Sequence, residues 1–325
     1  MTHPSTDWHE QIEADEAERY EGYAKAMAEL QKRRSAKYGK GRALHRKQVL
    51  GLPAIFEVRD GLPAHARHGL FAHAARYEAW VRLSNGNSEI VSDRKPDVHG
   101  FAIKILGVHG PGALGTETDC QDLLLNNTPT FAFPKSDEFV ELVLALSNGG
   151  GALLKHLFRR YGLFGALHMV KRLGASLKKP FPGYAAEPFY SAAPFACGPY
   201  AMKMRLLPPQ ADQPAASATD WAADLLQRLD KGALSFTLQA QFFVNETETP
   251  IENPSVEWPE NIAPYVTLAT LTLPAHDQWA ADAASLGKKI EATAFDPWRA
   301  LAAHRPLGEI NRARKVLYFG SQQNR

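Results

Sequence analysis

The sequence contains few cysteines, almost no net charge and no long apolar run. Its two cysteines, Cys120 and Cys197, are too few for a disulfide framework or a cysteine-based zinc site. The 37 lysines and arginines nearly balance 35 aspartates and glutamates, so composition does not predict nucleic-acid binding. No stretch of about 18 uncharged apolar residues occurs, and the N-terminal residues lack the pattern of a secretory signal. We therefore expect a soluble cytoplasmic protein with no nucleic-acid partner and no stable membrane insertion.

The composition is that of an ordinary globular protein. Hydrophobic residues make up 45% of the chain and charged residues 22%, which excludes the disordered and fibrous classes. A chain of 325 residues can bury roughly three quarters of its unfolded surface, in one large domain or two modest ones. Residues 7–35 are rich in Glu, Ala, Lys and Tyr. They predict a polar helix that lies against the body of the protein or against a partner subunit.

Short apolar segments rich in β-branched or aromatic residues follow from residue 54 onward. In 234–244, Phe236, Leu238 and Ala240 alternate with polar residues, as in an antiparallel strand with one buried face. The segments are irregularly spaced and do not alternate with helices, which argues against a doubly wound parallel sheet. We predict an α+β fold in which an antiparallel sheet or closed β-barrel carries helical insertions and C-terminal helices. The predicted strands are 54–58, 79–84, 100–107, 200–207, 234–244 and 265–273.

The segment 135–176 is helical in character, and part of it is strongly basic. Between residues 153 and 179, seven lysines and arginines lie among apolar residues with no acidic residue. Such a segment is either a basic amphipathic surface for a membrane or an apolar anion, or a packed helical insertion with a solvated cationic face. Residues 297–325 predict two helices broken near Pro306.

Two patterns gather polar side chains on one face of an element. In the strand 79–84, Arg82 and Ser84 point the same way because residues two apart share a face. In the last helix, spacings of 4, 3 and 4 residues keep four polar side chains in one narrow stripe. Either pattern fits a solvated surface or a site for an anionic ligand. The stripe consists of Arg314, Tyr318, Ser321 and Arg325.

Four segments, in order along residues 40–325, resemble the catalase superfamily of haem proteins. The first, Arg42-Ala-Leu-His45, is similar to that family's distal histidine motif, which leads into the first barrel strand. The second, VRLSNG, is similar to the strand that supplies an arginine for a haem propionate and a hydroxyl partner for the histidine. The third and fourth are the NNTP run that begins at Asn126 and the RKVLY segment that ends at Tyr318.

The resemblance implies a ferric haem b cofactor and assigns roles to individual residues. Tyr318 would be the anionic axial ligand, favoured by the cation of Arg314 one helical turn away. On the opposite face, His45 would move the proton of a peroxide, with Asn126 bonded to that peroxide and Ser84 orienting the histidine. The remaining haem contacts would be Arg42, Arg82 and Arg325 at the propionates, Phe131 and Phe139 against the macrocycle, and Ser321 in the proximal stripe.

Two departures from the family favour peroxidase chemistry. After His45 the family's small residues are replaced by Gln48, Val49 and Leu50, and the chain is similar to the short catalase-related proteins because it is shorter than a full catalase. A shorter chain has less material for the narrow access route that dismutation of hydrogen peroxide needs. We therefore expect a haem peroxidase that reduces hydrogen peroxide or organic hydroperoxides with a small organic electron donor, and that has weak or no catalase activity.

Two other functions remain open at this point. One is a fatty-acid hydroperoxide isomerase or lyase of the allene-oxide-synthase type, in which segment 153–179 would hold the lipid carboxylate. The other is a non-enzymatic haem or lipid carrier on the same barrel. The resemblance further implies an N-terminal helical arm, residues 1–39, and a single haem-binding domain, residues 40–325, with a helical insertion at about 135–195. Because family members often exchange N-terminal arms, a homodimer is expected.

Overall fold

A single antiparallel sheet forms the centre of the protein. The computed structural model describes residues 3–178, 180–215 and 220–325. Within these residues nine strands pair side by side, and every pairing is antiparallel. The strands are β1 (Gln48–Val58), β2 (Ala75–Asn85), β3 (His99–Pro111), β4 (Glu117–Asn126), β5 (Phe189–Tyr190), β6 (Phe195–Cys197), β7 (Tyr200–Leu207), β8 (Leu234–Phe242) and β9 (Val266–Leu273).

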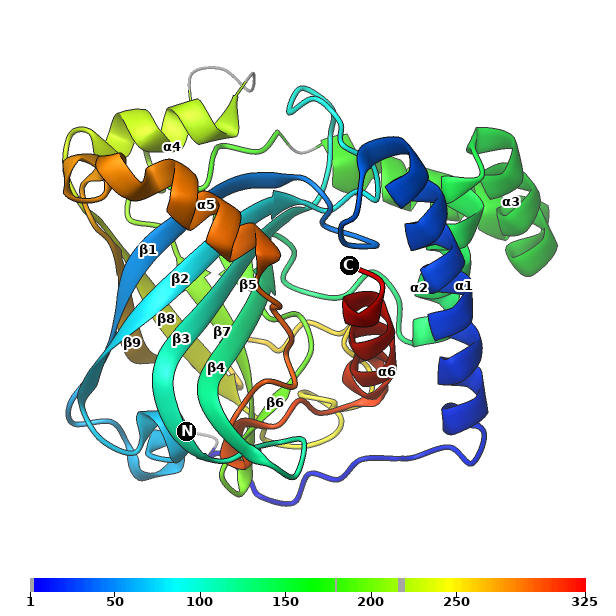
Figure 1. Ribbon diagram of the computed structural model, residues 1–325. Helices are drawn as coiled ribbons and strands as arrows, with labels where there is room; N and C mark the ends of the chain where they lie inside the picture. The colour runs from blue at the N-terminus through cyan, green and yellow to red at the C-terminus, as the bar shows by residue number, and fades with distance from the viewer. Residues whose placement is uncertain (1–2, 179, 216–219) are drawn as a thin grey trace.

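The sheet closes into an eight-stranded barrel. Its order is β5-β4-β3-β2-β1-β9-β8-β7, and a further pairing of β5 with β7 completes the ring, while β6 pairs with β7 outside it. Closure removes the unpaired edges that an open sheet would expose. The barrel is visible at the left of Figure 1, with strands β1 to β4 facing the viewer. The predicted antiparallel barrel with helical insertions is therefore confirmed.

Side chains fill the barrel rather than leaving a pore. In β8, Leu234, Phe236 and Leu238 are buried, whereas Ser235 between them is exposed, which confirms the alternation expected from the sequence. The ring of Phe236 meets that of Phe101 from β3 at a centroid distance of 5.3 Å. Each buried aromatic or large aliphatic side chain contributes roughly 1.5–3 kcal/mol through removal of apolar surface from water. The barrel interior is thus the main hydrophobic core of the protein.

Helices cover one side of this barrel. The segment predicted to be helical, 135–176, contains α2 and α3, and β5 and β6 follow it. The predicted break near Pro306 separates η5 from α6. The helices are α1 (Glu16–Tyr38), α2 (Ser136–Ser147), α3 (Gly150–Lys178), α4 (Trp221–Leu229), α5 (Ala283–Ala292) and α6 (Glu309–Gln323), with the short 3₁₀ helices η1 (Ala64–Ala66), η2 (Gly69–Phe71), η3 (His276–Gln278), η4 (Ala280–Asp282) and η5 (Ala302–His304).

The start of the first helix differs from the sequence prediction. Helix α1 begins at Glu16 and not at residue 7, because the preceding residues form an extended strap along the body of the protein. Along this strap the Ser5 amide donates to the Phe243 carbonyl (2.8 Å) and the Gln11 amide donates to Glu252 (2.9 Å). Helix α1 then packs along α6 of the same chain (Figure 1).

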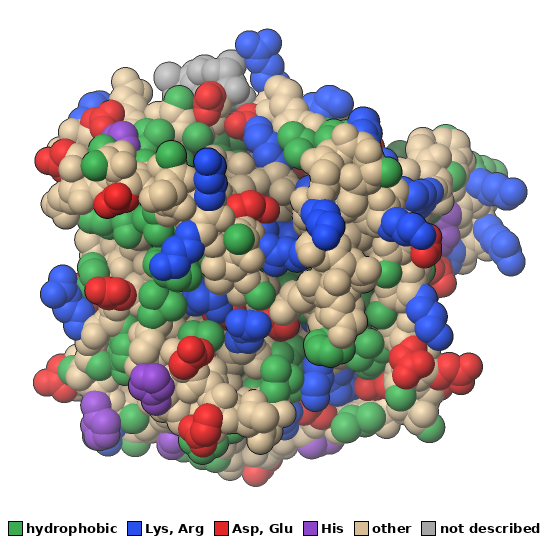
Figure 2. Space-filling view, in the orientation of Figure 1, with side chains coloured by type: hydrophobic (Ala, Val, Ile, Leu, Met, Phe, Trp, Pro, Cys, Tyr) green, Lys and Arg blue, Asp and Glu red, His purple; other side chains and the backbone are tan. Residues whose placement is uncertain are grey.

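The surface charge agrees with the near-neutral composition. Figure 2 shows acidic and basic side chains interspersed over the face that Figure 1 presents. Among the described residues, no helix is long and apolar enough to cross a membrane.

One arginine holds the strap, α1 and α6 together. Arg312 of α6 donates to Glu16 (2.7 Å), and it also donates to Glu10 and Glu252 (2.9 Å each). Only 12% of the Arg312 side chain is exposed, so water screens these three ion pairs weakly. Since α6 carries part of the candidate site, this cluster helps to fix the position of the site.

We expect the Arg312→Met variant to be strongly destabilised. Removal of the guanidinium leaves three carboxylates close together without their shared cation, which costs about 3–5 kcal/mol for a buried charge cluster. Urea unfolding followed by circular dichroism measures the loss. The matched control is Arg76→Met, because Arg76 and Glu57 form an exposed pair that contributes at most about 1 kcal/mol. Equal stability of the two variants would contradict the role of Arg312.

Candidate functional site

The outer face of β2, β3 and β4 forms one wall of a cavity. Successive residues of a strand point to opposite faces, and the odd-numbered residues here, such as Val81, Phe101 and Ile103, are buried in the core. The even-numbered residues form two rows across the three strands on the other face. These rows are Arg82, Ala102 and Leu124, and then Ser84, Gly100 and Asn126.

The cavity lies between this wall, the loop before β1, and helices α2 and α6. The cavity has a volume of about 230 Å³. The structure brings together every residue that the sequence singled out as a candidate. All of them line this cavity: Arg42, His45, Arg82, Ser84, Asn126, Phe131, Phe139, Arg314, Tyr318, Ser321 and Arg325.

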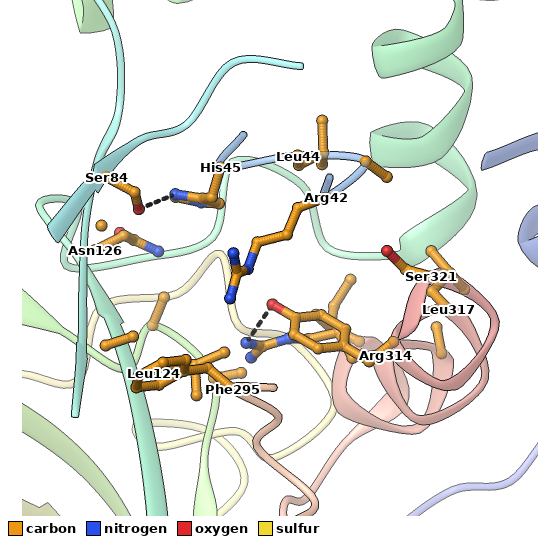
Figure 3. A pocket seen from close by; sticks show the side chains of 18 of the residues that line it. Arg42, Leu44, His45, Ser84, Leu124, Asn126, Phe295, Arg314, Leu317 and Ser321 are labelled. Carbon is orange, nitrogen blue, oxygen red and sulfur yellow. Dashed lines mark hydrogen bonds between the residues drawn. The ribbon is translucent and has the colours of Figure 1, made fainter. Parts of the chain in front are cut away.

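His45 and Ser84 form a hydrogen-bonded pair on the barrel side of the cavity (Figure 3). The His45 Nδ1 atom lies 3.1 Å from the Ser84 Oγ atom. The backbone of His45 is in the left-handed region (φ 51°), an unfavourable conformation for a histidine. Two contacts hold this loop: the His45 amide donates to the Gly86 carbonyl (3.0 Å) and Arg82 donates to the His45 carbonyl (2.9 Å).

The imidazole of His45 is kept neutral by its surroundings. Burial lowers its pKa from the ordinary value of 6.5 to about 3, and the cations of Arg82, Arg314 and Arg42 add to this effect. With Nδ1 facing the serine hydroxyl, Nε2 is the ring nitrogen left for a ligand. His45 can therefore accept a proton near neutral pH.

The absence of a side chain at Gly100 makes room for the His45–Ser84 pair. It lies between Ser84 and Asn126 in the cross-strand row. A Cβ atom at this position would approach both the His45 Nδ1 and the Ser84 Oγ to 2.7 Å, closer than non-bonded atoms allow. The missing side chain therefore lets the histidine approach the strand wall closely.

Asn126 is oriented by its own turn. Its side-chain oxygen accepts from both the amide (2.8 Å) and the hydroxyl (2.5 Å) of Thr128. This Asx-type turn leaves the NH₂ group of Asn126 to donate to a ligand. Figure 3 shows Asn126 on the same side of the cavity as His45 and Ser84.

Helix α6 forms the opposite wall. Arg314 donates to the Tyr318 hydroxyl (3.3 Å) and to the Asn311 side-chain oxygen (3.0 Å). The guanidinium carbon also lies 5.3 Å from the centre of the Tyr318 ring, within the range of a cation–π contact. Arg314 therefore contacts both the hydroxyl and the ring face of Tyr318.

Three further arginines converge on one acidic residue that the sequence did not reveal. Glu291, from α5, accepts from Arg42 (2.6 Å) and from Arg82 (2.8 Å) through its carboxylate. Its backbone carbonyl accepts from Arg325 (2.6 Å), and the Thr293 carbonyl accepts from Arg42 (2.7 Å). Three guanidinium groups against one carboxylate leave a local charge of +2.

The lining as a whole favours an apolar anion. In the part of the chain that the structure describes, it contains four arginines and no carboxylate, and most of the rest is apolar. Burial, with a contribution from the neighbouring Arg82, lowers the pKa of Arg42 to about 9. An anion bound beside these arginines would relieve their mutual repulsion.

Other site residues also escaped the sequence prediction. Gly100 carried a weak signal, because a glycine inside a strand pattern often marks a close approach. Phe295 and Leu44, which line the cavity, carried none. Nor did Gln31 of α1, whose amide donates to the Gly41 carbonyl (2.8 Å) and to the Ser321 carbonyl (3.0 Å), so that it ties the histidine loop to α6.

Comparison with known proteins places the fold. No family model matches the sequence, and no curated protein matches it. Solved structures do match over 100% of this chain: a fungal catalase (TM-score 0.67, 17% identity), a bacterial catalase (0.66, 17%) and catalase A from Saccharomyces cerevisiae (0.67, 16%). The chain spans 66%, 63% and 67% of the lengths of these proteins. The protein therefore has the catalase fold.

Proposed function

We propose that this protein is a haem-dependent peroxidase that reduces hydrogen peroxide or organic hydroperoxides with an organic electron donor. The observation that carries the proposal is the pairing of two walls across one cavity. One wall presents the Arg314–Tyr318 pair, and the other presents the His45–Ser84 pair beside Asn126. A phenolate ligand and a neutral proton acceptor on opposite faces are what a peroxide-reducing haem site requires.

The cavity fits haem b in charge and in lining. The local charge of +2 from three arginines and Glu291 balances the charge of −2 on two propionates. Phe131 and Phe139, whose rings lie 4.9 Å apart, provide an apolar contact for a macrocycle. The residues that would hold the cofactor are Tyr318 at the iron, Arg42, Arg82 and Arg325 at the propionates, and Arg314, Ser321, Phe131 and Phe139 around them.

Haem bound here would supply the redox-active iron at which a peroxide is reduced. The chain itself would move the proton. His45 Nε2 accepts the proton of the incoming hydroperoxide and returns it to the departing oxygen, while Ser84 holds the ring through Nδ1. Asn126 donates its NH₂ hydrogen bond to the same peroxide and keeps it beside the histidine.

Peroxidase chemistry is favoured over dismutation by the segment after His45. There the larger residues Gln48, Val49 and Leu50 are the first three residues of β1, and Val49 and Leu50 pack against the barrel core. The Gln48 amide donates to the Gly287 carbonyl of α5 (3.0 Å). These residues do not line the cavity, so the preference for an organic donor rests on the departure of this segment from the catalase motif.

A second candidate function uses the apolar end of the cavity. Met27, Leu44, Val140 and Leu317 line it and pack into one cluster with Phe139. An acyl chain would find its contacts there, as in a fatty-acid hydroperoxide isomerase or lyase. A haem or lipid carrier is less favoured, because a carrier does not need the proton transfer for which the His45–Ser84 pair is suited.

One comparison separates these functions. Purified protein is titrated with haem, and turnover is measured with hydrogen peroxide alone, with hydrogen peroxide and a phenolic donor, and with a polyunsaturated fatty-acid hydroperoxide. We expect a Soret band on haem addition and donor-dependent turnover of hydrogen peroxide. Absence of a Soret band would exclude all haem functions. Donor-independent rearrangement of the lipid hydroperoxide would favour the isomerase, and no turnover of any substrate would favour the carrier.

We expect Tyr318→Phe to weaken haem binding by at least about 100-fold. This is the upper end of the effect of losing an outer-shell metal partner, and the phenol oxygen would be a direct ligand. Haem titration followed by absorption measures the affinity. Tyr265→Phe is the control, because Arg205 lies over the Tyr265 ring outside the cavity in a similar arginine–tyrosine pair. A Tyr318→Phe protein with unchanged affinity and spectrum would show that the ligand assignment is wrong.

We expect His45→Ala to lower the rate of peroxide reduction by about 10²–10⁴-fold, the usual contribution of a general acid–base residue. In the unaltered protein the rate constant should stay flat from about pH 8 down to pH 5. A histidine with a pKa of about 3 remains neutral throughout this range and loses its proton-accepting form only near pH 3. Stopped-flow absorption measures the rates, with the exposed His73→Ala as control. A rate that falls with a midpoint near pH 6.5 would contradict the burial of His45.

We expect Gly100→Ala to impair the peroxide reaction without loss of haem. The added methyl group would displace His45 and Ser84 from their hydrogen bond, since it would lie 2.7 Å from both. The rate should fall at least about 10-fold, within the general acid–base contribution, while haem affinity stays close to that of the parent. Gly22→Ala, in open space on α1, is the control. Parallel loss of haem and rate would indicate a general packing defect instead.

A further inference from the structure

Helix α3 forms a hairpin on the outer side of the molecule. At Gly162 the backbone leaves the helical region (φ 67°, ψ −176°) and divides the element into two arms, 150–161 and 163–178. The hairpin packs on α2 and projects away from the barrel beyond α1 and α2 (Figure 1). This is the segment for which the sequence left two interpretations open. Lys179, at its end, lies outside the described residues.

One face of the hairpin packs against the body of the protein, and the other face is exposed to solvent. Leu157, Ala166 and Met169 are buried in a cluster with Phe133. The outer face holds six of the eleven large apolar side chains that are exposed in the described part of the chain. Phe164, next to the bend, is 85% exposed, and the others are 42–57% exposed. The six are Leu154, Phe158, Leu163, Phe164, Leu167 and Val170.

The same outer face is cationic. Residues 150–178 contain no aspartate or glutamate. Lys155 and Arg159 are exposed beside Leu154 and Phe158, and Lys171 is exposed next to Val170. Figure 2 shows basic side chains projecting from the edge of the molecule over α3.

One basic residue of the hairpin already has acidic partners. Arg160 donates to Asp137 and Glu141 of α2 (2.7 Å each). It therefore anchors the hairpin to the body, whereas Lys155, Arg159 and Lys171 remain on the exposed side. On the packed side, acidic residues of α2 therefore neutralise Arg160. The exposed side carries basic residues.

We infer that the α3 hairpin docks on the surface of an anionic lipid membrane. Exposed Phe and Leu side chains flanked by Lys and Arg are the features of an element that lies in the headgroup region without crossing the bilayer. A second copy of the same face would bring like charges together, so charge complementarity favours an anionic surface over self-association. This inference goes beyond the proposed function and does not depend on haem.

The hairpin packs on residues that also line the apolar side of the cavity. The apolar cluster beneath α3 includes Phe139 and Phe131, and both of these also line the cavity. A membrane contact at α3 would therefore place the bilayer on the side where the cavity wall is apolar.

The inference is tested by vesicle flotation with the full chain. We expect binding to vesicles of phosphatidylcholine and phosphatidylglycerol, and little binding to phosphatidylcholine alone. Binding should weaken as sodium chloride rises from 50 to 500 mM, because salt screens exposed charges. Equal binding to both vesicle types, or no binding to either, would overturn the inference.

Matched substitutions connect binding to the hairpin. Leu167→Glu should abolish flotation, whereas Leu114→Glu, at a similarly exposed leucine between β3 and β4, should leave it unchanged. The double variant Lys155→Ala, Arg159→Ala should weaken binding to anionic vesicles about 30-fold, from about 5-fold for each basic residue near the surface. Unchanged circular dichroism and an unchanged midpoint of urea unfolding establish that these variants fold. Flotation that survives both hairpin variants would place the contact elsewhere.

A direct readout keeps the test independent of flotation. Tryptophan at the bend, in Phe164→Trp, should show a blue-shifted emission when anionic vesicles are added, because the side chain enters an apolar layer. Sedimentation of the protein without vesicles tests the competing occupant. Self-association that Leu167→Glu abolishes, together with an unshifted Phe164→Trp emission, would assign the face to a second copy and overturn the membrane inference.

Discussion

The two-residue period of the β-strand is the constraint on which both the barrel and the cavity depend. In β2, β3 and β4 one set of side chains, including Val81 and Phe101, fills the barrel, and the alternate set, including Arg82 and Ser84, faces the cavity. A register shift of one residue would exchange the two sets and bury arginine in the core. The same pairing therefore sets both the stability of the fold and the composition of the site.

Charge stoichiometry distinguishes the structural ion cluster from the candidate binding site. Around Arg312, three carboxylates surround one guanidinium, and one of them, Glu10, also pairs with Arg305 (2.6 Å). Around Glu291 the ratio is reversed, with three guanidinium groups on a single acidic residue. Charges removed from water need partners, so an excess of two buried cations favours a dianionic ligand. A chain that is nearly neutral overall thus concentrates positive charge where the proposed cofactor would bind.

The helical layer links this site to the outer surface. Helix α2 lines the cavity through Phe139 and Val140 and supports α3 on its other side. The proposed membrane contact and the proposed peroxide site would therefore share one apolar wall. Because lipid hydroperoxides partition into bilayers, a hairpin at the membrane surface would bring such substrates close to the apolar side of the cavity.

Local patterns in the sequence determined six of the nine strands that the structure describes, the helical insertion and the polar faces of β2 and α6, because alternation and helical spacing are properties of nearby residues. The other candidate residues came from the resemblance to the catalase superfamily, and β4, β5 and β6 were not predicted. Only the tertiary structure decided the partners from distant segments. Glu291 lies about 250 residues from Arg42, Gly100 matters only because His45 packs on it, and Gln31 connects two loops that are far apart in the chain. Tertiary packing also decides where α1 begins and which face of α3 stays exposed. Such contacts leave no local signal, since their energy arises only when the folded chain brings the segments together.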